Sequence, residues 1–187
     1  MKSRQQPNPG DRGRAVQARQ GAKRRDVLLG LAGEHYVCCE LARRGLEPRL
    51  ARRNAKAVDI LVLAGKGTSF RIQVKTSAGR NNPRAWDVGK TKPRLGGASV
   101  YVFVNLWDDL GLMPEVFVVP ASVVLEQASW HTKRPVFRLR RPSEEEFRAK
   151  WGLILQLAES GRHPEVGVGG PGAAGGETGA ANTGRRT

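Results

Sequence analysis

Residues 56–77 read KAVDILVLAGKGTSFRIQVKTS, with two apolar runs on either side of a Gly-Lys-Gly turn. Alternation within each run predicts a β-hairpin. Polar side chains interrupt both strands: Asp59 stands in the first, and Gln73 and Lys75 stand in the second. Because side chains along a strand alternate between its two faces, Gln73 and Lys75 share one face. If Asp59 faces the same side, the hairpin carries a polar cluster within a core sheet.

The segment before the hairpin reads VLLGLAGEHYVCCELARR over 27–44 and predicts a helix that ends at Gly45. At 100° per residue, Glu34 falls in the middle of the apolar face, whereas Glu40 points away and is expected to be exposed. A carboxylate on a core face is costly unless another group pairs with it. Glu34 is therefore a candidate neighbour of the polar cluster on the hairpin.

The remaining elements indicate one domain built around a sheet. The element order α-β-β-β-β-α-β-α predicts an α/β (α+β) fold, in which helices flank a central mixed sheet of about four to five strands. The segments from 98 to 107 and from 143 to 160 give the clearest signals, a buried strand and a helix. Strands are predicted over 46–52, 58–63, 69–76, 98–107, 115–120 and, at an edge, 136–139, and helices over 27–44, 121–130 and 143–160.

The two ends of the chain lack hydrophobic periodicity. Residues 1–25 are predicted to form a disordered basic arm, residues 26–160 the folded domain, and residues 161–187 a disordered tail rich in Gly and Ala. The chain carries 32 Lys and Arg against 17 Asp and Glu, a formal net charge of +15, which favours a polyanionic partner. A G+C-rich genome is an alternative explanation of the Arg, Ala and Gly content.

Composition also indicates where in the cell the protein is expected. No apolar run approaches the roughly 20 residues of a membrane span, so no membrane association is expected. The only cysteines, Cys38 and Cys39, are adjacent and predict no disulfide framework. A cytoplasmic protein is therefore expected.

The order of these polar residues resembles a known family. Glu34 on a helix, Asp59 on a strand and Gln73-Val74-Lys75 on the hairpin partner resemble the PD-(D/E)XK nuclease superfamily, the restriction-endonuclease-like fold, over residues 27 to about 120. The resemblance implies a metal-dependent DNA endonuclease that uses Mg²⁺ or Mn²⁺. It implies that Asp59, Gln73, Glu34 and the backbone carbonyl of Val74 hold the metal, and that Lys75 assists the attacking water.

Two positions depart from the family pattern. Val58 precedes Asp59 where the family commonly has Pro, and Gln73 stands where the family has Asp or Glu. An amide oxygen can bind a metal but brings no charge, so a lower metal affinity is expected. Some members of the superfamily, including homing endonucleases of this fold, are similar in having Gln at this position.

The long polar segment over 78–97, AGRNNPRAWDVGKTKPRLGG, is predicted to be a loop that contacts nucleic acid. Its cations suit phosphates, and an indole suits stacking on bases. An equal alternative is that Trp86 anchors the loop to the body of the domain. The candidate contact residues are Arg80, Arg84, Trp86, Lys90, Lys92 and Arg94.

Other functions fit the same residues. Asp59 paired with Lys75, and Glu34 paired with Arg71, would be structural ion pairs. The protein would then be a catalytically inactive nucleic-acid-binding module on the same fold, with Gln73 as the mark of lost catalysis. A basic protein–protein adaptor is a third class. The sequence leaves open whether the partner is DNA or RNA, and whether the chain forms a homodimer.

Overall fold

A computed structural model of the chain describes residues 9–51, 58–63, 69–78, 84–89, 99–107, 112–140 and 143–160. Its helices and strands are, in order, α1 Pro9–Ala42, β1 Glu47–Leu50, β2 Ile60–Leu63, β3 Ser69–Ser77, β4 Ala85–Asp87, β5 Val100–Asn105, β6 Glu115–Pro120, α2 Ala121–Gln127, β7 Val136–Arg138, α3 Ser143–Phe147 and α4 Trp151–Ser160. Within these ranges, no helix combines the length and the apolar composition that a membrane span requires.

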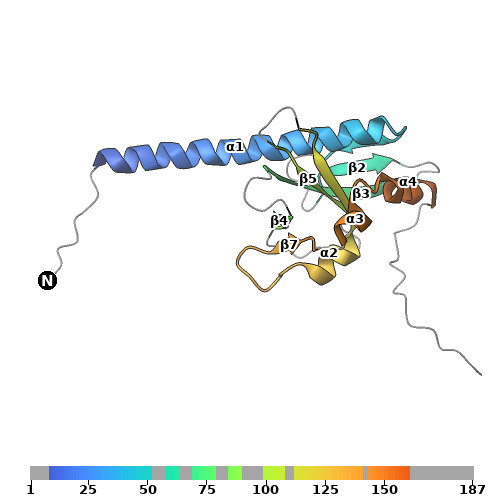
Figure 1. Ribbon diagram of the computed structural model, residues 1–187. Helices are drawn as coiled ribbons and strands as arrows, with labels where there is room; N and C mark the ends of the chain where they lie inside the picture. The colour runs from blue at the N-terminus through green and yellow to red at the C-terminus, as the bar shows by residue number, and fades with distance from the viewer. Residues whose placement is uncertain are drawn as a thin grey trace, which may run out of the picture.

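Five strands form a central mixed sheet in the order β1-β2-β3-β5-β6 (Figure 1). β3 and β5 run parallel, and the other neighbours run antiparallel. β4 and β7 pair with each other in a separate two-stranded sheet. The predicted α/β fold with a mixed sheet is confirmed. The predicted order places four strands before α2, whereas the structure has six there among the described residues, and β4 has no counterpart among the predicted strands. The predicted edge strand over 136–139 is β7.

The central sheet is covered differently on its two sides, here called the α1 side and the β7 side. Figure 1 shows α1 along one side of the sheet, and β4, β7 and α2 on the other. β5 is buried on both, as predicted for an apolar strand. The core of the α1 side includes Val37, Leu41, Ile72, Val102 and Ile154. The core of the β7 side includes Trp86, Tyr101, Phe103, Phe117 and Phe137.

Helix α1 begins at Pro9 and not at Val27 as predicted. Residues 9–25, predicted to be part of a disordered arm, are therefore helical. The side chains from 13 to 28 are exposed, and Figure 1 shows this half of α1 extending beyond the sheet. The predicted tail over 161–187 lies outside the described residues.

The end of α1 agrees with the sequence. Gly45 has a φ of 80°, in the left-handed region that glycine adopts without strain. Its N–H donates to the carbonyl of Ala42 (3.0 Å), and the N–H of Leu46 donates to the carbonyl of Leu41 (3.2 Å). This pair of bonds satisfies the last carbonyls of the helix and turns the chain towards β1.

The segment from 143 to 160 is not one helix, as predicted, but two. Ala149, with a φ of 49°, separates α3 from α4. The N–H of Ala149 donates to the carbonyl of Val116 (2.8 Å), so this point of the chain is bonded to β6 instead of continuing the helix. Such a contact between segments far apart in sequence leaves no local signal.

Helix α1 packs tightly on β3 at Gly33. A Cβ added there would lie 2.0 Å from Oγ1 of Thr76, whereas one added at Gly30 would meet nothing within 4 Å. Gly33→Ala is therefore expected to lower the free energy of unfolding by about 1–3 kcal/mol through overpacking. Gly30→Ala, the matched control, is expected to raise it by about 0.5–1 kcal/mol. Urea unfolding measures both, and equal effects would contradict this packing of α1 on β3.

Candidate functional site

Asp59 stands at the point where β2 and β3 stop pairing. Their register ends with Ile60 opposite Ile72, and the N–H of Asp59 donates to the carbonyl of Ile72 (3.0 Å). Its side-chain Oδ2 accepts a hydrogen bond from the N–H of Val74 (2.8 Å) and another from the side-chain amide of Gln73. The carboxylate of Asp59 thus takes the place of a strand partner beside β3.

Gln73 and Lys75 point to the β7 side of the sheet. In the parallel register of β3 and β5, Gln73 lies opposite Tyr101 and Lys75 lies opposite Phe103. Both aromatic side chains belong to the core of the β7 side. Since Asp59 contacts Gln73, the structure brings Asp59, Gln73 and Lys75 together on one side of the sheet, as the strand alternation predicts.

Burial sets the electrostatics of this cluster. Desolvation raises the pKa of Asp59, and the hydrogen bond from Val74, the charge of Lys75 and the amide of Gln73 oppose it only in part. The same environment raises the pKa of Tyr101 to about 12, through burial and the nearby charge of Asp59. The carboxylate is therefore held where ionisation is unfavourable, and the phenol beside it stays protonated.

Sequence reasoning missed Tyr101 as a member of the cluster. Its side chain is only 2% exposed, and its residue position faces that of Gln73. A weak signal was present, because Tyr101 carries the only hydroxyl in the strand VYVFVN. Pairing between β3 and β5 decides which residue of that strand meets Gln73, and the sequence does not show the register.

Glu34 is half-buried on α1, one residue after Gly33, which packs against Thr76. Because Thr76 follows Lys75 in β3, Glu34 lies level with the polar cluster along the strand, although α1 covers the other side of the sheet. The described groups that shift the pKa of Asp59 do not include Glu34. The structure therefore does not join Glu34 to Asp59 directly.

The prediction that Glu40 is exposed is wrong. Glu40 is 8% exposed, and its carboxylate binds the guanidinium groups of Arg43 (2.7 Å) and Arg44 (2.6 Å). These hydrogen bonds hold the pKa of Glu40 below its usual value. The two arginines follow Glu40 on α1 and the turn after it and cover its carboxylate, an arrangement that the helical periodicity alone does not show.

Few acidic groups are available here for a metal ion. In the described part of the chain, no three side chains of His, Cys, Asp and Glu lie together as a metal-binding group. Groups that can supply oxygen ligands do lie at Asp59: its own carboxylate, the side-chain amide of Gln73, whose nitrogen now faces the carboxylate, and the backbone carbonyl of Val74. The Val74 carbonyl points to the same side of β3 as its N–H, towards Asp59, where no described β2 residue pairs with it. Carboxylate, amide and carbonyl oxygens suit a hard divalent cation, so the residues fit the metal that the resemblance implies.

Trp86 does not take the predicted role of stacking on a nucleic-acid base. It lies in β4, is 2% exposed, and its ring centroid lies 4.8 Å from that of Phe103 and 5.6 Å from that of Phe117. The alternative is confirmed: Trp86 anchors its segment to the body of the domain.

Arg84 is likewise engaged within the protein. Its guanidinium binds Glu115 (2.6 Å) and Glu144 (2.9 Å) and lies 5.1 Å from the ring centroid of Phe117. Arg148 shares both glutamates with it. The predicted role of Arg84 as a phosphate contact is therefore corrected to that of a structural ion pair. The other predicted contacts, Arg80, Lys90, Lys92 and Arg94, lie outside the described residues.

Comparison with known proteins gives likenesses to solved structures but no match in sequence. No family model matches the sequence, and no curated protein matches it. The solved structure of a bacterial homing endonuclease, I-Ssp6803I, is similar with a TM-score of 0.48 and 17% sequence identity, over 71% of this chain and 94% of that chain. A likeness of this size carries no argument about function, and the PD-(D/E)XK resemblance stays a prediction.

Proposed function

We propose that the protein is a divalent-cation-dependent nuclease that hydrolyses phosphodiester bonds in DNA. The observation that carries the proposal is the cluster of Asp59, Gln73 and Lys75 on one side of the sheet, at the point where β2 leaves β3. A carboxylate whose pKa is raised by burial is unfavourable for the fold, and such groups occur most often at functional sites. A lysine beside it supplies the positive charge that phosphodiester chemistry requires.

The chain's own residues have distinct roles in this proposal. Asp59, Gln73 and the carbonyl of Val74 would hold Mg²⁺ or Mn²⁺, which when bound neutralises phosphate charge and acidifies water. A turn of 180° about the last torsion of Gln73 would present its amide oxygen where its nitrogen now meets Asp59. Lys75 would orient the attacking water and stabilise charge on the phosphate. Glu34 is the further ligand that the resemblance implies; it lies level with Lys75 along β3 but on a helix that covers the other side of the sheet.

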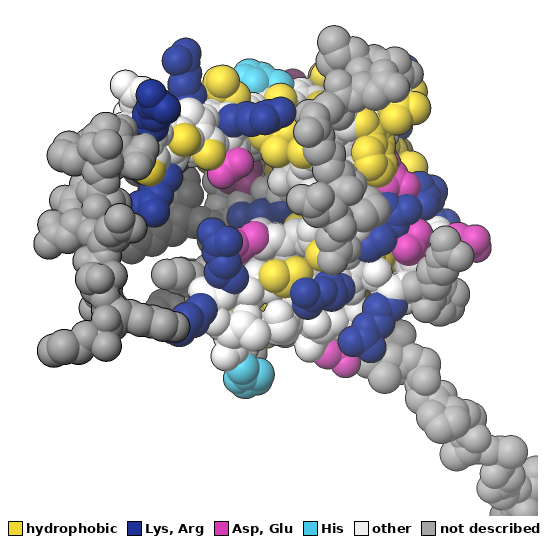
Figure 2. Space-filling view, turned by 60° about the vertical axis from the view of Figure 1, so that its left-hand side comes forward, with side chains coloured by type: hydrophobic (Ala, Val, Ile, Leu, Met, Phe, Trp, Pro, Cys, Tyr) yellow, Lys and Arg dark blue, Asp and Glu magenta, His cyan; other side chains and the backbone are white. Residues whose placement is uncertain are grey.

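DNA is the proposed partner because of charge. The formal net charge of +15 is carried by the folded domain as well as by the N-terminal segment. Figure 2 shows Lys and Arg side chains spread over the described surface, from the helix along the top to the lower part of the molecule. A surface of this kind binds phosphate backbones through displacement of counterions, so binding is expected to weaken steeply with salt.

Cleavage of plasmid and oligonucleotide DNA by the full chain, with Mg²⁺, Mn²⁺ or EDTA, tests the proposal. Either cation is expected to support cleavage, and EDTA to abolish it. Lys75→Ala is expected to lower the cleavage rate by about 100-fold. Arg71→Ala removes the same charge from the same face of β3 and is expected to change the rate by less than about 3-fold. Cleavage in EDTA, or equal losses in the two variants, would contradict the proposal.

A catalytically inactive DNA-binding module is the second candidate. The hydrogen bond from the Gln73 amide to Asp59 favours it, because an amide can satisfy a buried carboxylate without any cation. Salt-sensitive DNA binding without cleavage under either cation would establish this second function.

A further inference from the structure

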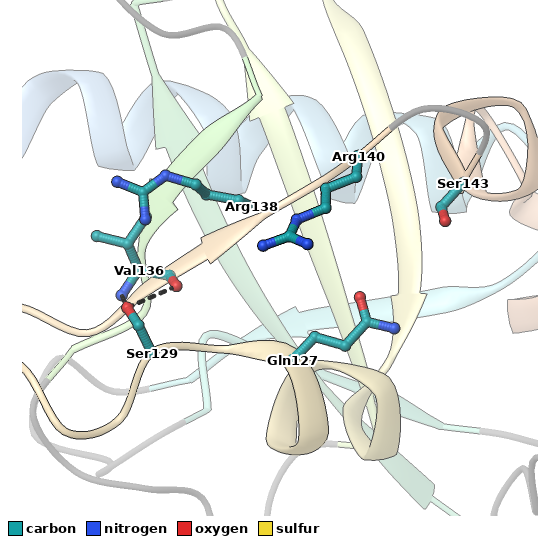
Figure 3. A pocket seen from close by; sticks show the side chains of 6 residues that line it. All are labelled: Gln127, Ser129, Val136, Arg138, Arg140 and Ser143. Carbon is teal, nitrogen blue, oxygen red and sulfur yellow. Dashed lines mark hydrogen bonds between the residues drawn. The ribbon is translucent and has the colours of Figure 1, made fainter.

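A hollow of about 510 Å³ lies between the end of α2 and strand β7, outside the cluster around Asp59. Of the six described side chains that line it, five carry hydrogen-bond donors, and two of these are arginines (Figure 3). The lining residues are Gln127, Ser129, Val136, Arg138, Arg140 and Ser143.

Arg138 is the last residue of β7, and Arg140 follows it two residues later in the chain, on the same outer face. Phe137 and Leu139 are buried in the core of the β7 side, so Arg138 and Arg140 point outward and are exposed. In Figure 3 the guanidinium of Arg140 turns into the hollow towards α2, and that of Arg138 lies beside Val136. Residues two apart in extended chain are about 7 Å apart, so Arg138 and Arg140 place two cations next to each other along the end of β7 and the segment after it.

The charge of these arginines is not neutralised within the described part of the protein. Arg84 and Arg148 share two glutamates, and Arg43 and Arg44 share one. Neither Arg138 nor Arg140 has such a partner among the described residues. Two exposed arginines that line one hollow and have no described carboxylate partner favour an anionic ligand.

Hydrogen bonds join two of the residues that line the hollow, Ser129 and Val136. The hydroxyl of Ser129 donates to the carbonyl of Val136 and accepts from its N–H, both at 3.1 Å, which ties the end of α2 to β7. The amide of Gln127 and the hydroxyl of Ser143 complete the lining, and side chains of both kinds contact phosphate oxygens in protein–DNA interfaces. The described side chains that line the hollow include none that is aromatic, and their donors suit a phosphate backbone.

We propose that Arg138 and Arg140 bind the phosphates of one DNA strand at this hollow. The inference rests on the proposed function in naming DNA as the ligand. β7 and α2 lie on the side of the central sheet to which Asp59, Gln73 and Lys75 point, so the hollow and the cluster belong to the same side of the sheet. The contact positions the duplex without reading its sequence, because phosphate contacts carry no base information.

Binding of the full chain to a short fluorescent DNA duplex in EDTA, across a salt titration, tests the site. Arg138→Ala/Arg140→Ala is expected to weaken binding about 10-fold at 0.1 M salt and to reduce the slope of log K against log salt by about 2. The matched control, Arg43→Ala/Lys150→Ala, removes the same charge beside α1 and α4 and is expected to weaken binding less than about 2-fold. Arg138→Lys/Arg140→Lys keeps the charge but not the fork, so an intermediate loss is expected.

The outcomes separate this site from the proposed function. Unchanged binding in the Arg138 and Arg140 double variant, or equal losses in it and its control, would overturn the site. The nuclease proposal would still stand if the parent chain cleaves DNA. Selective loss of binding, together with no cleavage by the parent under Mg²⁺ or Mn²⁺, would support the site and overturn the nuclease. Absence of DNA binding by the parent would overturn both. Melting temperatures verify that each variant is folded.

Discussion

Asp59→Asn is expected to lower the rate of Mg²⁺-dependent DNA cleavage by about 1,000-fold or more while the protein stays folded and binds DNA. Asn keeps the volume of Asp, and its amide oxygen can still accept the hydrogen bond from Val74. The Asn side chain lacks the negative charge that holds a cation. Gln73 is also uncharged, so it cannot replace that charge. Cleavage rates and DNA affinity, measured on the same preparation, check both parts of this expectation.

The stability of Asp59→Asn gives a second, independent measurement. The pKa of Asp59 in the folded protein is raised above its ordinary value of 3.8, chiefly by burial. The folded state therefore binds this proton more tightly than the unfolded state does, and stability falls as the pH rises from 3.8 through the folded pKa. Asn does not ionise, so the variant does not lose stability in this way as the pH rises. In EDTA at pH 7 the variant is expected to melt at the same temperature as the parent or higher, with the advantage disappearing below about pH 4.

With Mg²⁺ present, the parent is expected to melt at a higher temperature than Asp59→Asn. A cation that binds only the folded state raises the melting temperature of the parent, and without the Asp59 charge this gain is expected to disappear. A variant that melts several degrees below the parent in EDTA at pH 7 would instead identify Asp59 as a stabilising partner of Lys75. The ion-pair interpretation of the hairpin would then be correct.

The alternation of side chains in the hairpin could be predicted because it is local. A period of two fixes Gln73 and Lys75 on one face whatever lies around them, and Asp59 joins them once the hairpin forms.

The start of α1 could not be predicted from a local pattern of this kind. Residues 9–25 have no apolar periodicity, and their side chains from residue 13 onward are exposed, so helix-favouring Ala, Arg, Gln and Lys extend the helix without a packing signal.

The errors at Trp86 and Arg84 have a different origin. Strand β4 has three residues, too few for a periodic pattern, and its partner β7 follows about 50 residues later. The burial of Trp86 and the ion pairs of Arg84 both depend on elements that arrive after them in the sequence. A basic segment with an indole then predicts a nucleic-acid contact, although Trp86 lies in the core and Arg84 in an ion-pair network.

Gln73→Glu is the change expected to reveal most about the site. Gln73 is 6% exposed and its amide contacts Asp59, so the variant places a second carboxylate against the first. In EDTA, the loss of a hydrogen bond and the like charges are expected to lower the free energy of unfolding by about 1–3 kcal/mol. Gln20→Glu, the same substitution at an exposed position of α1, is the control and is expected to change little.

Mg²⁺ decides what that destabilisation means. If the amide oxygen of Gln73 is a ligand, a carboxylate there binds the cation more tightly, so Mg²⁺ is expected to raise the melting temperature of Gln73→Glu more than that of the parent. Cleavage should then be kept at lower Mg²⁺ concentrations. The Gln73→Glu/Asp59→Asn double variant is expected to lose this response, because it again has a single carboxylate, while recovering stability in EDTA. A melting temperature that is lowered equally with and without Mg²⁺ would show that Gln73 and Asp59 form a buried hydrogen-bonded pair, and that the hairpin holds no metal.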